Sequence, residues 1–288
     1  MRHPTLLVLC VSSALALSAC QNPKNEGEDV ERALADLNVI DESNLNDIML
    51  TVGDADEAAA YFRSAVKSNP DRIDLQRGLG QSLVRAKRPS EAVGAWKKVV
   101  SLPGATNEDR VSLADALIRA GDWEQAEAEL NKIPPTHETF RRYRLEAMIA
   151  DSKEEWKKAD SFYETAVGLT TNPATVLNNW GYSKLTRADY KGAEDLFIQS
   201  LSYDAKRFTT KNNLILARGA QRKYDLPVIS MTQIERAQLL HTLALSAIKQ
   251  GDVTIGKGLL QEAIDTHPQH FEAAARALEA LENNISNG

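Results

Sequence analysis

Apolar residues recur along this chain with the spacing of a helix rather than that of a strand. In several places a small residue is followed four positions later by a large apolar one, and residues four apart share one face of a helix. These pairs are Ala58/Phe62, Ala92/Trp96, Ala126/Leu130, Ala159/Tyr163, Ala193/Phe197 and Gly256/Leu260, and the five alanines lie 34, 34, 33 and 34 residues apart. The pattern predicts amphipathic helices that repeat with this period.

A second series of small residues lies upstream of these pairs, which predicts two helices per repeat. This upstream series is Gly80, Ala114, Ala147, Gly181 and Ala244. We expect the small residue of the first helix to face the small residue of the second, so that the two axes approach closely. Turn residues such as Gly121-Asp122 separate the two helices, and prolines such as Pro173 end the second. The units are expected to start near residues 39, 73, 107, 140, 174, 208 and 237.

The period and the residue types resemble those of the tetratricopeptide repeat (TPR), a helical hairpin whose copies stack side by side. The resemblance implies an all-α fold: a right-handed superhelical solenoid of about six to seven helical hairpins. The expected N-terminal array covers residues 39–222, and residues 237–288 are expected to form a C-terminal repeat with a capping helix.

The sixth unit departs from this pattern. Residues 223–236 contain Pro227 and several β-branched residues where a second helix would be expected. These residue types disfavour a helix, so the segment is predicted to be an irregular, extended break. We expect it to pack against the solenoid through Leu226, Val228 and Ile229.

The first residues of the chain predict export and a lipid anchor. Residues 1–19 have a basic start and a short apolar run, which is typical of a signal peptide. The run ends in Leu17-Ser18-Ala19-Cys20, which resembles the bacterial lipobox. That resemblance implies cleavage before Cys20 and a covalent lipid on its thiol, with residues 20–38 as a tether. Gln21 after the cysteine implies, by the same resemblance, the periplasmic face of the outer membrane. The alternative is an ordinary cleaved signal with an incidental cysteine.

Composition and motifs narrow the possible functions. The 288 residues carry a formal net charge of −6, which disfavours nucleic-acid binding because that activity needs a basic surface. Two cysteines are too few for a zinc ribbon, and the paired His267 and His270 lack further ligands, so no metal site is expected. Ser64 and Lys67 match one motif of penicillin-binding enzymes without the others. We therefore predict a protein that is not an enzyme, with no cofactor and no small-molecule substrate.

The first helices of the repeats are the candidate binding surface, because TPR arrays bind peptides along that face. The expected inward positions form a basic stretch followed by an amide and apolar stretch: Arg77, Arg85, Arg119 and Arg144, then Asn178, Asn179, Tyr182, Asn212, Asn213 and Leu216. An asparagine side chain can both donate to and accept from a peptide backbone. Alternatively, the asparagines connect neighbouring helices and the arginines form a solvated face.

Several stretches are more specific than a generic TPR. Residues 71–93, 134–150, 178–190 (NNWGYSKLTRADY) and 212–252, the last including the break around Pro227, resemble the TadD family. TadD proteins are TPR outer-membrane lipoproteins of the tight-adherence (Flp pilus) system. The resemblance implies a pilotin-like role, assisting localisation, folding or oligomerisation of the outer-membrane secretin, with the secretin or other Tad proteins as partners.

Two further hypotheses stand beside this one. The chain could be a TPR scaffold lipoprotein of another envelope machine, such as outer-membrane protein insertion or peptidoglycan synthesis. An envelope enzyme is the third, and it has no constellation of catalytic residues in its favour.

Overall fold

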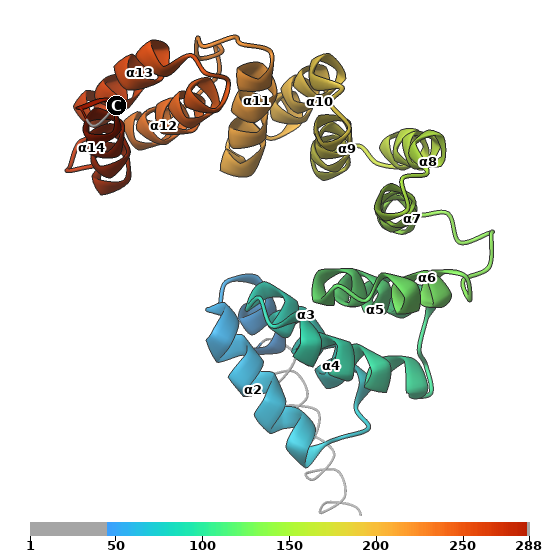
Figure 1. Cartoon of the computed structure of the whole chain (residues 1–288). Helices are drawn as coiled ribbons and strands as arrows, with labels where there is room; N and C mark the ends of the chain where they lie inside the picture. The colour runs from blue at the N-terminus through green and yellow to red at the C-terminus, as the bar shows by residue number, and fades with distance from the viewer. Residues whose placement is uncertain (1–44, 287–288) are drawn as a thin grey trace, which may run out of the picture.

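The computed structural model describes residues 45–286, and all regular structure in that range is helical. A helical stretch at 45–51 precedes the helices labelled in Figure 1. Their bounds are α2 Ala55–Ser68, α3 Ile73–Arg85, α4 Pro89–Ser101, α5 Asn107–Ala120, α6 Trp123–Leu130, α7 Phe140–Ser152, α8 Trp156–Gly168, α9 Ala174–Thr186, α10 Tyr190–Tyr203, α11 Phe208–Ala220, α12 Gln233–Lys249, α13 Val253–Thr266 and α14 Glu272–Ser286. The expected signal peptide, Cys20, the tether and the start near 39 lie outside the described residues.

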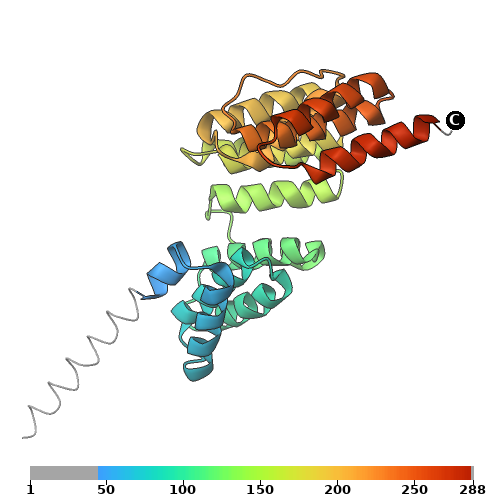
Figure 2. The ribbon, with the colours of Figure 1, turned by 90° about the vertical axis from the view of Figure 1, so that its left-hand side faces the viewer.

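Successive helices pack as hairpins. The first helix of a repeat, here called the A helix, packs against the B helix that follows it: α3 with α4, α5 with α6, α7 with α8, α9 with α10 and α12 with α13. Helix α2 packs on α3, and α14 covers α13 at the C-terminal end. The side view in Figure 2 shows the helices stacked one layer on the next. The predicted all-helical repeat solenoid is therefore confirmed.

A single residue in the left-handed backbone region closes the turn between each A helix and its B helix. These residues are Lys87 (φ 57°), Gly121 (84°), Glu154 (58°), Ala188 (64°) and Gly251 (86°). The next helix begins at an aspartate in three of these turns, and in two of them its side chain caps the helix: Asp122 accepts from the backbone N–H of Gln125, and Asp189 from that of Gly192. Such side-chain acceptors satisfy N–H groups that have no partner within the helix. The turn therefore recurs with the repeat.

The hairpins pack by small-to-large contact, which corrects the expectation of small-to-small contact. A Cβ on Gly80 of α3 would lie 2.7 Å from the ring of Trp96 in α4. A Cβ on Gly181 of α9 would lie 2.6 Å from the ring of Phe197 in α10. The small residue of the A helix thus makes room for the large residue of the B helix. The alanine four residues before each ring is fully buried, as Ala92 and Ala193 show.

The sixth unit has no B helix. Helix α11 ends with the usual left-handed residue, Arg222 (φ 59°), but residues 221–232 are irregular and lead directly to α12. Helix α12 begins before the expected position 237, because Thr232 and Glu235 form a capping box at its start. Leu226 and Ile229 pack against neighbouring apolar clusters. The prediction for Val228 was wrong: its side chain is fully exposed.

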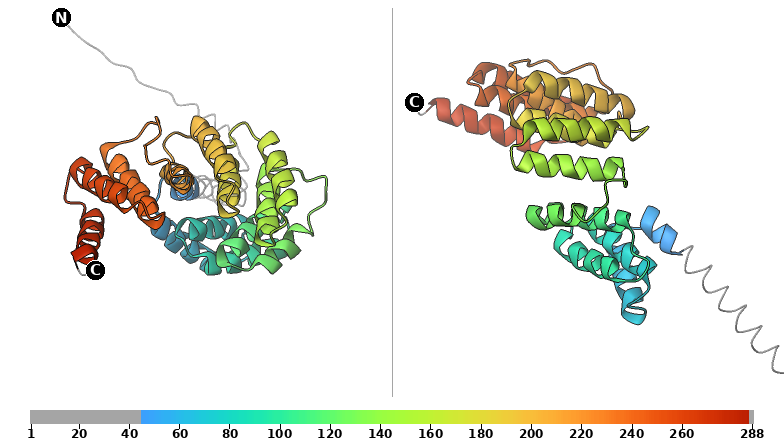
Figure 3. Two further views of the ribbon diagram at one scale, coloured as in Figure 1. Left: turned by 45° about the horizontal axis from the view of Figure 1, so that its top comes forward. Right: turned by 90° about the vertical axis from the view of Figure 1, so that its right-hand side faces the viewer.

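The repeats follow a curved path (Figure 1 and Figure 3). The A helices α5, α7 and α9 line the inner side of the curve, and the B helices α4, α8 and α10 lie outside. Helix α6 is short, with 8 residues, because the chain turns away at Pro134-Pro135. Within residues 45–286, no helix is long and apolar enough to cross a membrane.

Candidate binding site

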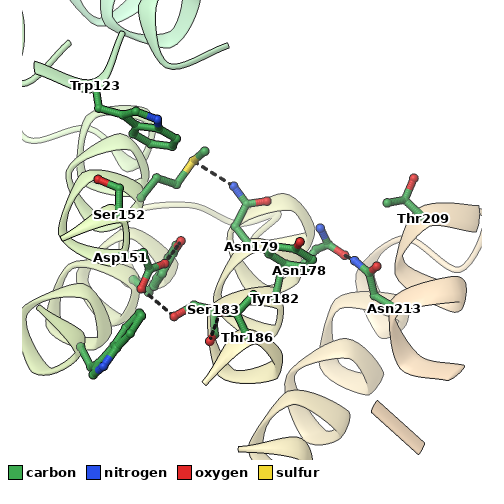
Figure 4. A pocket seen from close by; sticks show the side chains of 13 residues that line it. Trp123, Asp151, Ser152, Asn178, Asn179, Tyr182, Ser183, Thr186, Thr209 and Asn213 are labelled. Atoms are coloured by element: carbon green, nitrogen blue, oxygen red, sulfur yellow. Dashed lines mark hydrogen bonds between the residues drawn. The ribbon is translucent and has the colours of Figure 1, made fainter. Parts of the chain in front are cut away.

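A pocket of about 470 Å³ lies on the inner side of the curve, among the A helices α7, α9 and α11 (Figure 4). Its walls are Trp123, Met148, Asp151, Ser152, Trp156, Tyr163, Asn178, Asn179, Tyr182, Ser183, Thr186, Thr209 and Asn213. Four residues of the predicted amide and apolar stretch are therefore brought together here: Asn178, Asn179, Tyr182 and Asn213. Asn212 and Leu216 do not line this pocket.

Asn178 and Asn213 connect α9 to α11 across the pocket. The side-chain amide of Asn213 donates to Oδ1 of Asn178 at 3.2 Å, and the hydroxyl of Thr210 donates to the same oxygen at 3.0 Å. Asn213 is only 8% exposed. These contacts match the alternative in which the asparagines join neighbouring helices.

Asn212 makes the equivalent contact one step further along. Its Oδ1 accepts from the hydroxyl of Thr242 in α12 at 2.8 Å. Like the bond from Asn213 to Asn178, it joins two successive A helices, here α11 and α12. Leu216, also on α11, is 36% exposed.

Asn179 and Tyr182 differ from the other residues of the stretch. The amide of Asn179 donates to the sulfur of Met148 at 3.3 Å, and its Oδ1 accepts no hydrogen bond from a described residue. A thioether is a weak acceptor. Tyr182, one turn along α9, is 54% exposed. Both residues thus keep polar and aromatic surface available to a ligand in the pocket.

Arg77 and Arg85 from the predicted basic stretch are both bound within the chain. Arg77 donates to the two oxygens of Asp109 at 2.8 and 2.7 Å, which joins α3 to α5. Arg85 donates to three carbonyl oxygens: those of Met49 and Leu50 near the end of the helical stretch 45–51, and that of Gly53 in the turn after it. Free carbonyl groups at a helix end need such donors. These contacts favour structural roles for both arginines.

The other two arginines share one carboxylate. Arg119 donates to Asp115 one turn earlier at 2.8 Å, and Arg144 of α7 contacts the same carboxylate at 3.3 Å. Burial lowers the pKa of Arg144, and the charge of Asp115 opposes that effect. Binding of a partner by the four arginines stays a prediction, since each already has an acceptor in the chain.

Among the lining residues that sequence reasoning missed, Asp151 is the one that carries a charge. Its Oδ1 accepts from the hydroxyl of Ser183 at 2.7 Å and its Oδ2 from that of Tyr163 at 2.8 Å. Burial raises the pKa of Asp151, although these two hydrogen bonds oppose the rise. One signal could have identified it. The twelfth residue of the A helices α3, α5, α9 and α11 is apolar or small (Val84, Ile118, Leu185 and Gly219), whereas that of α7 is an acid.

Polar contacts fix the wall between α8 and α9. Asp160 accepts from the indole N–H of Trp180 at 2.6 Å and also pairs with Lys184 and Arg187. The guanidinium of Arg187 in turn lies 5.5 Å from the ring centre of Trp156, within the range of a cation–π contact. Within residues 45–286, no group of three or more His, Cys, Asp or Glu side chains could hold a metal ion.

Comparisons with known proteins agree with this architecture. The tetratricopeptide repeat family matches residues 50–101. No curated protein matches the chain. A tetratricopeptide repeat protein from Parabacteroides merdae has a similar structure, with a TM-score of 0.54 and 13% identity over 83% of this chain and 96% of that one.

Two larger proteins contain a similar solenoid. A chain of the APC/C hetero-tetramer Cut9–Hcn1 is matched with a TM-score of 0.58 and 15% identity, over 82% of this chain and 48% of that one. A chain of the human IFIT1 dimer with PPP-AAAA is matched with a TM-score of 0.56 and 14% identity, over 79% and 59%. This chain thus spans about half the length of the Cut9–Hcn1 chain. The described residues have the fold of the tetratricopeptide repeat proteins.

Proposed function

We propose that this chain is an outer-membrane-anchored TPR lipoprotein of Tad (Flp) pilus assembly. In this role it binds an extended segment of the secretin on the inner side of the solenoid and assists localisation or oligomerisation of the secretin. The observation that carries the peptide-binding part of the proposal is the pocket among α7, α9 and α11, where Asn179 and Tyr182 offer free binding surface.

The pocket suits a peptide in an extended conformation. A peptide backbone presents one N–H and one C=O per residue, and the free Oδ1 of Asn179 accepts from such an N–H. Tyr182 provides an amphipathic aromatic surface with little conformational entropy to lose. The pocket therefore supplies both a backbone contact and a side-chain contact.

The assignment to pilus assembly rests on the sequence. The resemblance to TadD spans nearly the whole chain and includes 212–252, which contains the irregular segment at 221–232 that a regular TPR array lacks. The lipobox ending in Cys20 supports the outer-membrane anchor, since a covalent lipid holds the scaffold where a secretin assembles.

Photo-crosslinking in the native envelope tests this proposal. A photoreactive benzoylphenylalanine replaces Tyr182 in one strain and Tyr203 in another, because both tyrosines are 54% exposed but Tyr203 ends the outer helix α10. The secretin is expected to crosslink from position 182 and not from position 203. Crosslinks only from 203, or crosslinks from 182 to a component of another envelope machine, would contradict it.

A further inference from the structure

The carboxylate of Asp151 lacks an ion-pair partner among residues 45–286. Among the described residues, no lysine, arginine or histidine forms an ion pair with it, although it is half-buried in the pocket wall. Arg187, whose positive charge acts on Asp151, pairs with Asp160 instead. A buried carboxylate without a cation is energetically unfavourable, and most such groups in proteins are paired.

The position of Asp151 in its helix adds to this imbalance. It lies in the last turn of α7, which ends at Ser152. The C-terminal end of a helix carries partial negative charge and favours cations over anions. Burial raises the pKa of Asp151, which is the direction expected for a carboxylate that the fold does not stabilise in its charged form. The chain thus places an acid where burial and the end of the helix both disfavour its charged form.

The carboxylate also has room to accept further hydrogen bonds. Each of its oxygens accepts one hydrogen bond, from Ser183 and from Tyr163, whereas a carboxylate has about four acceptor sites. Figure 4 shows Asp151 and Ser183 among the side chains that line the pocket. Both oxygens can therefore accept from a ligand while these two bonds are kept.

Aromatic side chains of the same pocket favour a cation. Trp123 and Tyr182 line it with 37% and 54% of their surface exposed. The faces of Trp and Tyr rings attract ammonium and guanidinium groups. Trp156, also in the lining, already holds the guanidinium of Arg187 at 5.5 Å from its ring centre, so this wall binds such a group within the chain itself.

The geometry points to a specific occupant: the pocket binds a lysine or arginine side chain of the partner's extended segment, with Asp151 as its counter-ion and Trp123 and Tyr182 beside its apolar stem. An acidic side chain would be repelled by Asp151. An apolar one would remove water from the carboxylate without replacing its interactions, which is unfavourable. This inference rests on the proposed function, because it names the side chain by which the inner surface recognises its peptide.

A selection from random peptides tests the inference without knowledge of the partner. Phage-displayed 12-residue random peptides are selected on the full chain in detergent, and peptides that also bind a Tyr182→Arg variant are discarded. The remaining sequences are expected to share an arginine or lysine at one position. In the leading peptide, replacing that residue by neutral citrulline (for arginine) or norleucine (for lysine) should weaken binding roughly 10- to 100-fold, the range for a hydrogen bond to a charged group.

The protein side of the test uses Asp151→Asn. This variant should bind the basic peptide and its neutral counterpart with equal, low affinity, and its thermal midpoint should be unchanged or higher. Glu164→Gln is the matched control, because it removes the same charge from an exposed position of α8 outside the pocket, and its binding should equal that of the unmodified chain.

The outcomes separate the two proposals. If the selected peptides share no basic residue, or if the neutral replacement binds equally well, the binding of a basic side chain beside Asp151 is overturned and the peptide-binding surface still stands. If no selected peptide depends on Tyr182, both the binding of a basic side chain and the peptide-binding surface are overturned.

Discussion

Gly181 of α9 lies directly against the ring of Phe197 in α10, so closely that a Cβ at position 181 would stand 2.6 Å from a ring carbon. Phe197 is fully buried, and its ring has no free volume into which to move without shifting its neighbours. The two residues set the distance between the helices of the hairpin that carries Asn178, Asn179 and Tyr182.

Gly181→Ala should therefore lower the free energy of unfolding by about 1–3 kcal/mol, because the added methyl group forces the two helices apart. Gly94→Ala is the matched control: it lies in the interior of α4, is exposed, and a Cβ there meets no atom within 4 Å. It should stabilise by about 0.5–1 kcal/mol. Chemical denaturation of both variants measures the difference, and equal effects would remove the close-contact argument.

The helices could be predicted because the small and large residues recur with one period, and each A helix from α3 to α11 begins where a unit was expected. Side-chain directions in the irregular segment at 221–232 were harder to predict. Val228 has the same apolar character as Ile229, yet only Ile229 packs inward. No periodicity applies to an irregular backbone, so the direction of each side chain depends on local turns that composition does not determine.

The pocket could be predicted only in part. Asn178, Asn179, Tyr182 and Asn213 follow from the repeat, since equivalent positions face the same side. Asp151 meets Ser183 only when α7 packs beside α9, at a separation of 32 residues. The pairing of Arg77 with Asp109 likewise joins two repeats. Contacts between repeats depend on the curvature of the solenoid, which the period alone does not determine.

The two asparagines that the repeat makes equivalent should behave differently when substituted. Asn213→Ala should lower the thermal midpoint, because it removes the hydrogen bond from Asn213 to Asn178 in a buried place. Asn179→Ala should leave the midpoint nearly unchanged and weaken partner binding about 2- to 13-fold, the effect of one lost hydrogen bond. Thermal unfolding and equilibrium binding of each variant test this. Normal binding by Asn179→Ala would exclude a contact to the ligand.

The ion pair between Arg77 and Asp109 should make stability depend on acid pH. Burial acts to raise the pKa of Asp109, but the hydrogen bonds from Arg77 and Thr106 outweigh it and hold the pKa below its usual value. Its stabilising contribution is therefore present above the unfolded-state pKa of about 3.9 and is lost as the pH falls through the lower folded-state pKa.

Asp109→Asn should accordingly destabilise the chain at neutral pH and reduce the loss of stability on acidification. Unfolding curves recorded from neutral pH to below the unfolded-state pKa measure both effects. Asp71→Asn is the control: its carboxylate is 78% exposed and paired with Lys98, so the change should stay below about 1 kcal/mol. If Asp109→Asn loses as much stability on acidification as the unmodified chain, the pair of Arg77 and Asp109 does not cause that loss.

Cys20→Ser should abolish the lipid anchor and reduce pilus assembly. The serine cannot accept the thioether-linked lipid, so the chain is expected to leave the outer-membrane fraction or to remain uncleaved. Membrane fractionation and metabolic labelling with a fatty acid test this. A variant that still carries label and fractionates with the outer membrane would show that the lipobox is not used.

The central claim is that the inner surface of the solenoid is the binding site. Its most direct test is to synthesise the secretin segment that crosslinks and to measure its affinity for two matched variants of this chain. Tyr182→Arg and Tyr203→Arg each place a cation at a tyrosine that is 54% exposed, the first in the pocket and the second on the outer helix α10. We predict that Tyr182→Arg weakens binding at least about tenfold, since an added cation repels a basic ligand and fills its site, whereas Tyr203→Arg binds like the unmodified chain. Equal affinities of the two variants, or a loss confined to Tyr203→Arg, would contradict it.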